Sequence, residues 1–325
     1  MTLRSAEGLH MKEIGGYLAL EPLVSDLYYA NLIPVNSARN AALYILRAKK
    51  AKKVWLPYFL CDSVSGVCDR EGIPYEFYHI GANFEPLFDR ELAENEWLYI
   101  VNYYGQIDAD TALGYQKRYG NVIFDNVQAF FQRPVDGMPT VYSCRKFFGV
   151  PDGGYAACDT KWNEPLPKDT SGDRLTHLLG RLESGSASAY YAEYQASNRR
   201  FKDLELREMS DFTKNLMGAI DYASVKKRRE DNFRFLDAQL GSQNQLQLKL
   251  PEGAFAYPFY HPNGMALKKR LAAEKIYVPT LWPNVLELAD GIEKDYAENI
   301  LPLPCDQRYD AEDMARICSE IARLE

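Results

Sequence analysis

The sequence has few of the residues that build metal sites and disulfide frameworks. Its 325 residues include six cysteines and four histidines, and no two cysteines form a C-x-x-C pair. No cluster of cysteine and histidine has the spacing of a metal site, so we expect no bound metal. We read the cysteines as reduced and mostly buried, which predicts a cytoplasmic protein.

Long hydrophobic runs and an excess of positive charge are also missing. No window approaches the roughly 18 apolar residues of a membrane span. Glu7, Lys12 and Glu13 interrupt the start of the chain, so we expect no signal peptide there. The 38 basic and 45 acidic residues give a net charge of −7. Such a chain has no general attraction for nucleic acid or anionic lipid. The one dense basic run, Lys226 to Arg229, is typical of a solvated helix face.

What the first half of the chain does contain is an alternation of strand-like and helix-like runs. Short apolar runs alternate with segments of helical periodicity, such as 61–72 and 109–119. This alternation predicts an α/β fold with a mostly parallel central sheet flanked by helices. Ligands of such sheets bind at the carboxyl ends of the strands. The strand-like runs are 54–59, 74–80, 97–105, 121–125 and 139–143, and the run 153–158 follows a turn.

The second half of the chain has a different pattern. Residues 173–200 and 209–240 are polar with helical spacing, and we expect one long helix over 211–240. We therefore predict a large domain over 1–225 and a smaller α+β domain over 226–325. For the smaller domain we expect an extended stretch at 253–261, a helix at 264–275, a strand at 276–282 and a last helix at 311–325.

Small polar residues open a predicted helix near the start of this alternation. Ser37, Ala38, Arg39 and Asn40 come directly before a run of helical periodicity. The first N–H groups of a helix and its positive dipole end suit a phosphate group. An ordinary helix cap is the alternative reading.

A carboxylate lies at the end of a predicted buried strand. Asp125 ends the run NVIFD, and Gln128 follows it by three residues. A carboxylate in this position is costly unless a cation or hydrogen-bond donors meet it. A helix cap would also explain Asp125.

A lysine follows the next strand and precedes a turn rich in glycine. Lys146 lies between Ser143 at the strand end and Gly153-Gly154, and Arg145 is its neighbour. Partial burial beside a second cation would favour the neutral amine, as covalent catalysis by lysine requires. The alternative is a surface lysine beside a turn.

The three clusters together have the composition of a pyridoxal phosphate site. The helix start would hold the phosphate, and Asp125 would keep the ring nitrogen protonated. Lys146 would bind the aldehyde and move protons at the substrate. Asp125 and Lys146 are thus the candidate catalytic residues. The candidate cofactor-binding residues are Ser37, Ala38, Arg39, Asn40, Tyr58, Phe59, Asp125, Gln128, Ser143 and Lys146.

With these motifs the sequence resembles the DegT/DnrJ/StrS family of sugar aminotransferases, which are fold-type I pyridoxal phosphate enzymes. The likeness covers nearly the whole chain, and Asp125 and Lys146 with its Gly-Gly are its most specific parts. The matching segments are Gly15-Gly16, Ser37 to Asn40, Asp125 to Gln128, Lys146 with Asp152-Gly153-Gly154, Met209-Ser210, Arg228-Arg229 and Leu303-Pro304.

The sequence departs from the family pattern around the cofactor. The family's ring-stacking aromatic residue falls on Cys61, so Tyr58 or Phe59 is expected to stack instead. The family serine lies about five residues before the lysine, whereas Ser143 lies three before Lys146.

The resemblance implies a pyridoxal phosphate-dependent aminotransferase that moves an amino group from an amino acid, expected to be glutamate, to a nucleotide-linked keto-sugar of polysaccharide biosynthesis. It also implies a homodimer, and Tyr190, Tyr191 and Tyr194 cannot all face one core from a single helix. Two alternatives stay open: another reaction of the same cofactor, such as dehydration or decarboxylation, and a non-catalytic scaffold that binds the cofactor or a sugar nucleotide.

Overall fold

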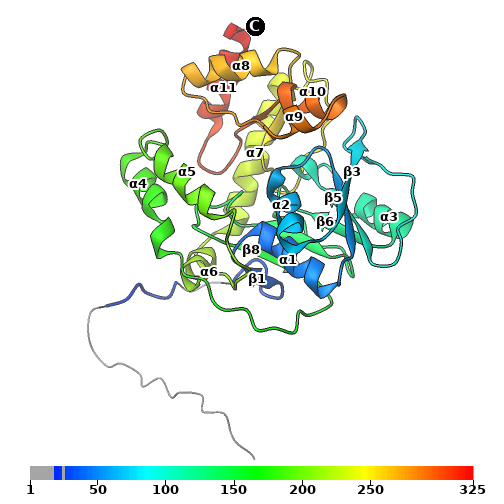
Figure 1. Cartoon of the computed structure of the whole chain (residues 1–325). Helices are drawn as coiled ribbons and strands as arrows, with labels where there is room; N and C mark the ends of the chain where they lie inside the picture. Colours follow the sequence, from blue (N-terminus) through cyan, green and yellow to red (C-terminus); the bar gives the residue numbers. More distant parts are fainter. Residues whose placement is uncertain (1–17, 24–25, 325) are drawn as a thin grey trace, which may run out of the picture.

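The central feature of the fold is a mixed, mostly parallel sheet of eight strands (Figure 1). The computed structural model describes residues 18–23 and 26–324. Strand β2 pairs in parallel with β3 and β5, and β5, β6 and β7 continue the parallel run. The edges are antiparallel, through β1 with β8, β8 with β7, and β3 with β4. The order is β1-β8-β7-β6-β5-β2-β3-β4, with β1 Ile33–Val35, β2 Lys53–Pro57, β3 Tyr75–Ile80, β4 Pro86–Leu87, β5 Glu96–Val101, β6 Val122–Asp125, β7 Thr140–Ser143 and β8 Gly154–Ala157.

The buried strands explain why the middle of the sheet was predictable from the sequence. Every residue of β6, β7 and β8 is buried, and β5 is buried from Trp97 onward. Continuous apolar runs are typical of parallel strands covered on both faces. Helix α1 (Ala38–Ala48) packs against β7 and β8, and α3 (Ala109–Tyr119) packs beside β6. Helix α2 (Asp62–Glu71) ends at Gly72, whose φ of 66° is in the left-handed region that favours glycine.

Two helices project from the sheet after β8, on the left of Figure 1 in green. They are α4 (Thr176–Ser184) and α5 (Tyr191–Arg200). Tyr190 packs against α4, since a Cβ on Gly180 would lie 2.2 Å from its ring. Tyr191 and Tyr194 are exposed instead. The three tyrosines therefore face different surroundings, as the sequence predicted.

The C-terminal part of the chain has its own small sheet and its own buried cluster. Strands β9 (Tyr257–Tyr260) and β10 (Ile300–Leu303) pair antiparallel. Around them lie α8 (Gly264–Ala273), α9 (Val285–Leu288), α10 (Ile292–Asn299) and α11 (Ala311–Leu324). The buried cluster includes Phe233, Leu236, Leu301 and Ile317. The fold is thus α/β with a smaller C-terminal α+β part, as predicted. The predicted boundary at 225/226 falls inside helix α7 (Tyr222–Leu240) and stays a prediction.

Three predicted elements differ from the structure. The single helix expected over 211–240 is divided into α6 (Asp211–Gly218) and α7, because Asp221 caps α7 by accepting a hydrogen bond from the Ser224 N–H at 3.0 Å. The strand expected over 97–105 ends at Val101 and continues as a 3₁₀ turn. The segment 276–282 forms no strand and runs as a loop. In the described part of the chain, no helix has the length and apolar character needed to cross a membrane.

Candidate active site

A cavity of about 240 Å³ lies at the carboxyl ends of the parallel strands. The chain runs from β2 outward to β3 and returns on the other side of β2 as β5, which makes this edge the topological switch point where α/β sheets bind ligands. Predicted site residues make up much of its lining. The lining consists of Ser37, Ala38, Arg39, Leu60, Cys61, Ser63, Val64, Tyr99, Val101, Asp125, Val127, Gln128, Ser143, Arg145, Lys146, Gly153, Phe201 and Trp282.

Asp125 is a buried carboxylate with both oxygens already hydrogen-bonded. The Tyr99 hydroxyl donates to Oδ2 at 2.8 Å, and the Val127 N–H donates to Oδ1 at 2.8 Å. Burial raises the pKa of Asp125 to about 6, although these two hydrogen bonds and the positive charge of Lys146 lower it. The carboxylate is therefore ionised at neutral pH in a place that favours a nearby cation. It is placed by the end of β6, as the sequence predicted.

Lys146 lines the same cavity, on the turn that follows β7. Its side chain is exposed and not partly buried as expected, since it lies on a turn between β7 and β8. Its nitrogen lies 5.9 Å from the centre of the Phe255 ring. Arg229 helps to fix this turn, because its guanidinium donates a hydrogen bond to the Phe147 carbonyl at 2.9 Å.

The burial of Arg229 also contradicts the prediction that the basic run 226–229 is a solvated helix face. Its side chain is buried, donates to the Ala254 carbonyl at 2.8 Å and lies 4.6 Å from the Phe147 ring. Burial lowers its pKa to about 10, so the guanidinium stays charged at neutral pH. The run does lie in a helix, as its spacing predicts. The groups that bury Arg229, however, lie far away in the sequence.

The start of helix α1 forms one wall of the cavity. The Ser37 hydroxyl caps the helix by accepting from the Asn40 N–H at 3.3 Å. Strand β8 approaches this helix so closely that a Cβ on Gly154 would lie 2.8 Å from the Ala38 nitrogen. A glycine is therefore required there. The first N–H groups of a helix have no partner within it, so this wall can bind an anion.

Two arginines add positive charge beside this helix start. Arg39 donates to the Phe201 carbonyl at 2.8 Å and to the Ser63 hydroxyl at 3.1 Å. The Arg145 guanidinium lies 3.9 Å from the centre of the Phe201 ring and donates to Asn198 Oδ1 at 2.7 Å. Burial lowers the pKa of Arg145 to about 10 and also lowers that of Arg39, and both stay charged at neutral pH. The cavity thus has a cationic end and a carboxylate at its floor.

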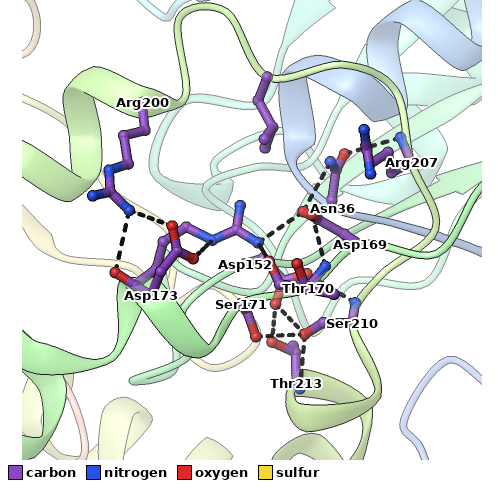
Figure 2. A network of polar contacts seen from close by, with 12 residues as sticks. Asn36, Asp152, Asp169, Thr170, Ser171, Asp173, Arg200, Arg207, Ser210 and Thr213 are labelled. Atoms are coloured by element: carbon purple, nitrogen blue, oxygen red, sulfur yellow. Dashed lines mark hydrogen bonds and ion pairs between the residues drawn. The ribbon is translucent and has the colours of Figure 1, made fainter.

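The glycine turn is anchored by a buried polar network (Figure 2). Asp152 accepts from the Ser210 N–H at 2.9 Å and its hydroxyl at 2.7 Å, and it also accepts from the Thr213 hydroxyl. Asp169 accepts from Asn36 Nδ2 at 3.1 Å on the far side of this network. These contacts connect the turn, the start of α6 and the residue before Ser37. They therefore hold two walls of the cavity in place.

Three predicted cofactor-binding residues do not line the cavity. The Asn40 side chain points to the loop at 204–205, where it donates to the Glu205 carbonyl at 2.8 Å. Tyr58 stacks on Phe77 with ring centres 5.0 Å apart. Phe59 is fully buried against Tyr103. Leu60 and Cys61, which precede α2, are the residues that reach the cavity from this segment.

Gln128 lines the cavity and supports its backbone. Its Oε1 accepts from the Tyr104 N–H at 2.9 Å, in the turn after β5, where Tyr104 has a φ of 54°. The predicted Gly15-Gly16 match lies outside the described residues. Sequence reasoning missed Tyr99, Arg145 and Trp282 as cavity residues. Arg145 adjoins Lys146 and Tyr99 lies on a predicted strand, but no local signal indicates Trp282.

The chain was compared with known proteins by sequence and by structure. No family model and no curated protein matches the chain by sequence. Solved structures do match. The DesV protein of S. venezuelae, solved with a ketimine intermediate, shares 15% identity at a TM-score of 0.62 over 90% of this chain and 84% of its own. NtdA of Bacillus subtilis, solved with bound PMP, shares 14% identity at a TM-score of 0.63 over 90% of this chain and 73% of its own.

A third match carries the family name. A DegT DnrJ EryC1 StrS aminotransferase from Brucella abortus shares 14% identity at a TM-score of 0.58, over 90% of this chain and 85% of its own. The predicted resemblance is thus confirmed at the level of the fold: the chain has the fold of the fold-type I aminotransferases. At this identity, the likeness establishes the fold alone.

The residues present fit pyridoxal phosphate. The helix start beside Gly154, together with Arg39, Arg145 and Ser143, has the chemistry to hold a phosphate. Asp125 has the charge and burial to hold a protonated ring nitrogen. Lys146 is an amine on the same cavity.

Proposed function

We propose that this protein is a pyridoxal phosphate-dependent aminotransferase, which moves an amino group from an amino acid to a nucleotide-linked keto-sugar. The observation that carries the proposal is the convergence of Asp125, Lys146 and the start of α1 on one cavity at the switch point of the sheet. Solved proteins with this fold include sugar aminotransferases, which supports the sugar as acceptor.

The cofactor, when bound, supplies an aldehyde that exchanges amines and a ring that withdraws electrons from the substrate carbon. Asp125 would pair with the ring nitrogen and keep it protonated. Ser37, Ala38, Arg39, Ser143 and Arg145 would bind the phosphate. Lys146 would hold the aldehyde carbon and then, as a free amine, move a proton at the substrate carbon. Glutamate is our proposed amino donor.

We further propose that the enzyme is a cytoplasmic homodimer. Helices α4 and α5 expose apolar side chains, among them Leu182 at 80% and Tyr191 at 55%. Tyr and Leu on a projecting pair of helices are suited to contact a second copy of the chain. Burial lowers the pKa of Arg145 and the nearby Tyr194 raises it, so the contact would lie near the cavity.

The test of the function is a screen of acceptors. The protein loaded with pyridoxamine phosphate should convert at least one nucleotide-linked keto-sugar to its amino sugar, with return of the cofactor to the pyridoxal form. A dehydrated or decarboxylated product would instead assign another reaction of this cofactor. Failure to bind either cofactor form, under conditions that keep the protein folded, would refute the assignment as an enzyme of this class.

A further inference from the structure

Trp282 is the one cavity-lining residue that comes from the C-terminal part of the described chain, after residue 225. The other lining residues lie between Ser37 and Phe201. Trp282 belongs to the loop between α8 and α9, and its side chain is half-buried. It therefore shows part of its indole ring to the cavity from the side of the smaller sheet.

The indole ring of Trp282 packs against two buried aromatic rings. Its ring centre lies 5.2 Å from that of Phe59, in an edge-to-face arrangement, and 6.2 Å from that of Tyr103. Both supporting rings are buried, and the Tyr103 hydroxyl donates to the Phe59 carbonyl at 2.6 Å. The same loop is fastened to the segment between β2 and α2, where Asn284 Nδ2 donates to the Leu60 carbonyl at 2.8 Å. Trp282 is thus fixed in place before any ligand binds.

The cavity lining combines charged and apolar groups. Arg39, Arg145 and the start of α1 make part of the lining cationic. Trp282 is tied to the segment that contributes Leu60 and Cys61, which have little hydrogen-bonding capacity. A ligand group that meets this side therefore finds an aromatic ring beside small apolar groups. Such a wall suits the C–H face of a sugar ring, because the negative face of an aromatic ring attracts polarised C–H groups.

We propose that Trp282 is a specificity-determining residue, whose indole stacks against the hexose ring of the acceptor. The proposal rests on the proposed function, in which the cationic end and Asp125 hold the cofactor and the acceptor takes the remaining side. It assigns to the C-terminal part a direct role in the choice of acceptor. In this proposal the nucleotide portion of the acceptor does not contact Trp282.

The test measures ligand binding to the protein loaded with pyridoxal phosphate. The probes are UDP-glucose, dTDP-glucose and GDP-mannose, each compared with the nucleoside diphosphate that lacks the sugar. The variants are Trp282→Leu, which removes the ring, and Trp282→Phe, which keeps a smaller one. Trp162→Leu is the matched control, since Trp162 packs under Arg47 outside the cavity lining.

For the sugar nucleotide that the native protein binds best, Trp282→Leu should raise the Kd about tenfold, the loss of one stacking contact. Trp282→Phe should stay within about threefold, and the Kd of the free nucleoside diphosphate should not change. The Trp162→Leu control should leave the Kd of the sugar nucleotide and that of the cofactor unchanged.

The proposal is overturned if Trp282→Leu leaves the sugar nucleotide Kd unchanged, or if it weakens the sugar-free nucleotide or the cofactor by the same factor. It is also overturned if the native protein exchanges amines with a donor but binds none of the probes, a result that leaves the aminotransferase itself standing. Absence of amine exchange with every donor would refute the proposed function separately.

Discussion

Replacement of Asp125 by asparagine should affect the free protein and the cofactor complex in opposite directions. Burial raises the pKa of Asp125 from near 4 to about 6. A raised pKa means that the folded protein holds this proton more tightly than the unfolded chain does. Its contribution to stability is therefore complete below pH 4 and is lost as the pH rises through 6. This difference of about two pKa units makes the ionised Asp125 destabilise the folded protein by on the order of 3 kcal/mol at pH 8.

The asparagine side chain would remove that charge but would satisfy only part of the present hydrogen bonding. Its oxygen can accept from the Val127 N–H or the Tyr99 hydroxyl, and the loss of one hydrogen bond costs about 1 kcal/mol. The cofactor-free Asp125→Asn protein should therefore be more stable than the native protein at pH 8 by about 1–2 kcal/mol, but not at pH 4.

The assay is thermal or urea unfolding of both proteins, without cofactor, at pH 8 and pH 4, followed by the same measurement with pyridoxal phosphate. The cofactor should stabilise the native protein much more than the variant, and turnover of the variant should fall on the order of a hundredfold or more. A variant that is less stable than the native protein at pH 8 without cofactor would refute the reasoning. It would show that the carboxylate is stabilised by the protein alone.

Four further predictions test other parts of the site. Tyr99→Phe removes a hydrogen bond to the Asp125 carboxylate, so the low-pH limit of cofactor binding, followed by absorbance, should move up by about one pH unit; an unchanged limit would contradict the role of the hydroxyl. Borohydride should attach pyridoxal phosphate to Lys146, as peptide mapping would show, and a label on another lysine would refute the assignment. Arg145→Met should weaken the binding of pyridoxal phosphate about tenfold or more. The binding of pyridoxal should be nearly unchanged, because pyridoxal has no phosphate. Equal losses for the two compounds would point to a structural role of Arg145. Sizing at low micromolar concentration should show a dimer whose activity falls on dissociation, and a fully active monomer would exclude a site that needs both copies.

The sequence was most informative where a strand is buried on both faces. The runs at 97–105, 121–125 and 139–143 each predict a strand of the sheet, and parallel strands place their carboxyl ends at one edge. The meeting of Asp125 and Lys146 on one cavity follows from that geometry. The helix start at Ser37 was predicted from the small polar residues that precede a run of helical periodicity.

Other features depend on partners that are far away in sequence. Asn40 turns from the cavity because the carbonyl of Glu205 lies behind it, and Arg229 is buried by contacts with Phe147 and Ala254. Trp282 reaches the cavity through a loop in which the sequence indicated a strand. Local periodicity contains no information about such contacts, so these positions required the structure.

The most direct test of the central claim is the first half of the reaction. The purified protein, loaded with pyridoxal phosphate, is incubated with glutamate and with a panel of other amino acids, and the released cofactor is analysed by chromatography and mass. We predict pyridoxamine phosphate in an amount equal to the protein, together with the matching keto acid, and neither product from Lys146→Ala. A protein that binds pyridoxal phosphate firmly but forms no pyridoxamine phosphate with any amino acid would contradict the account.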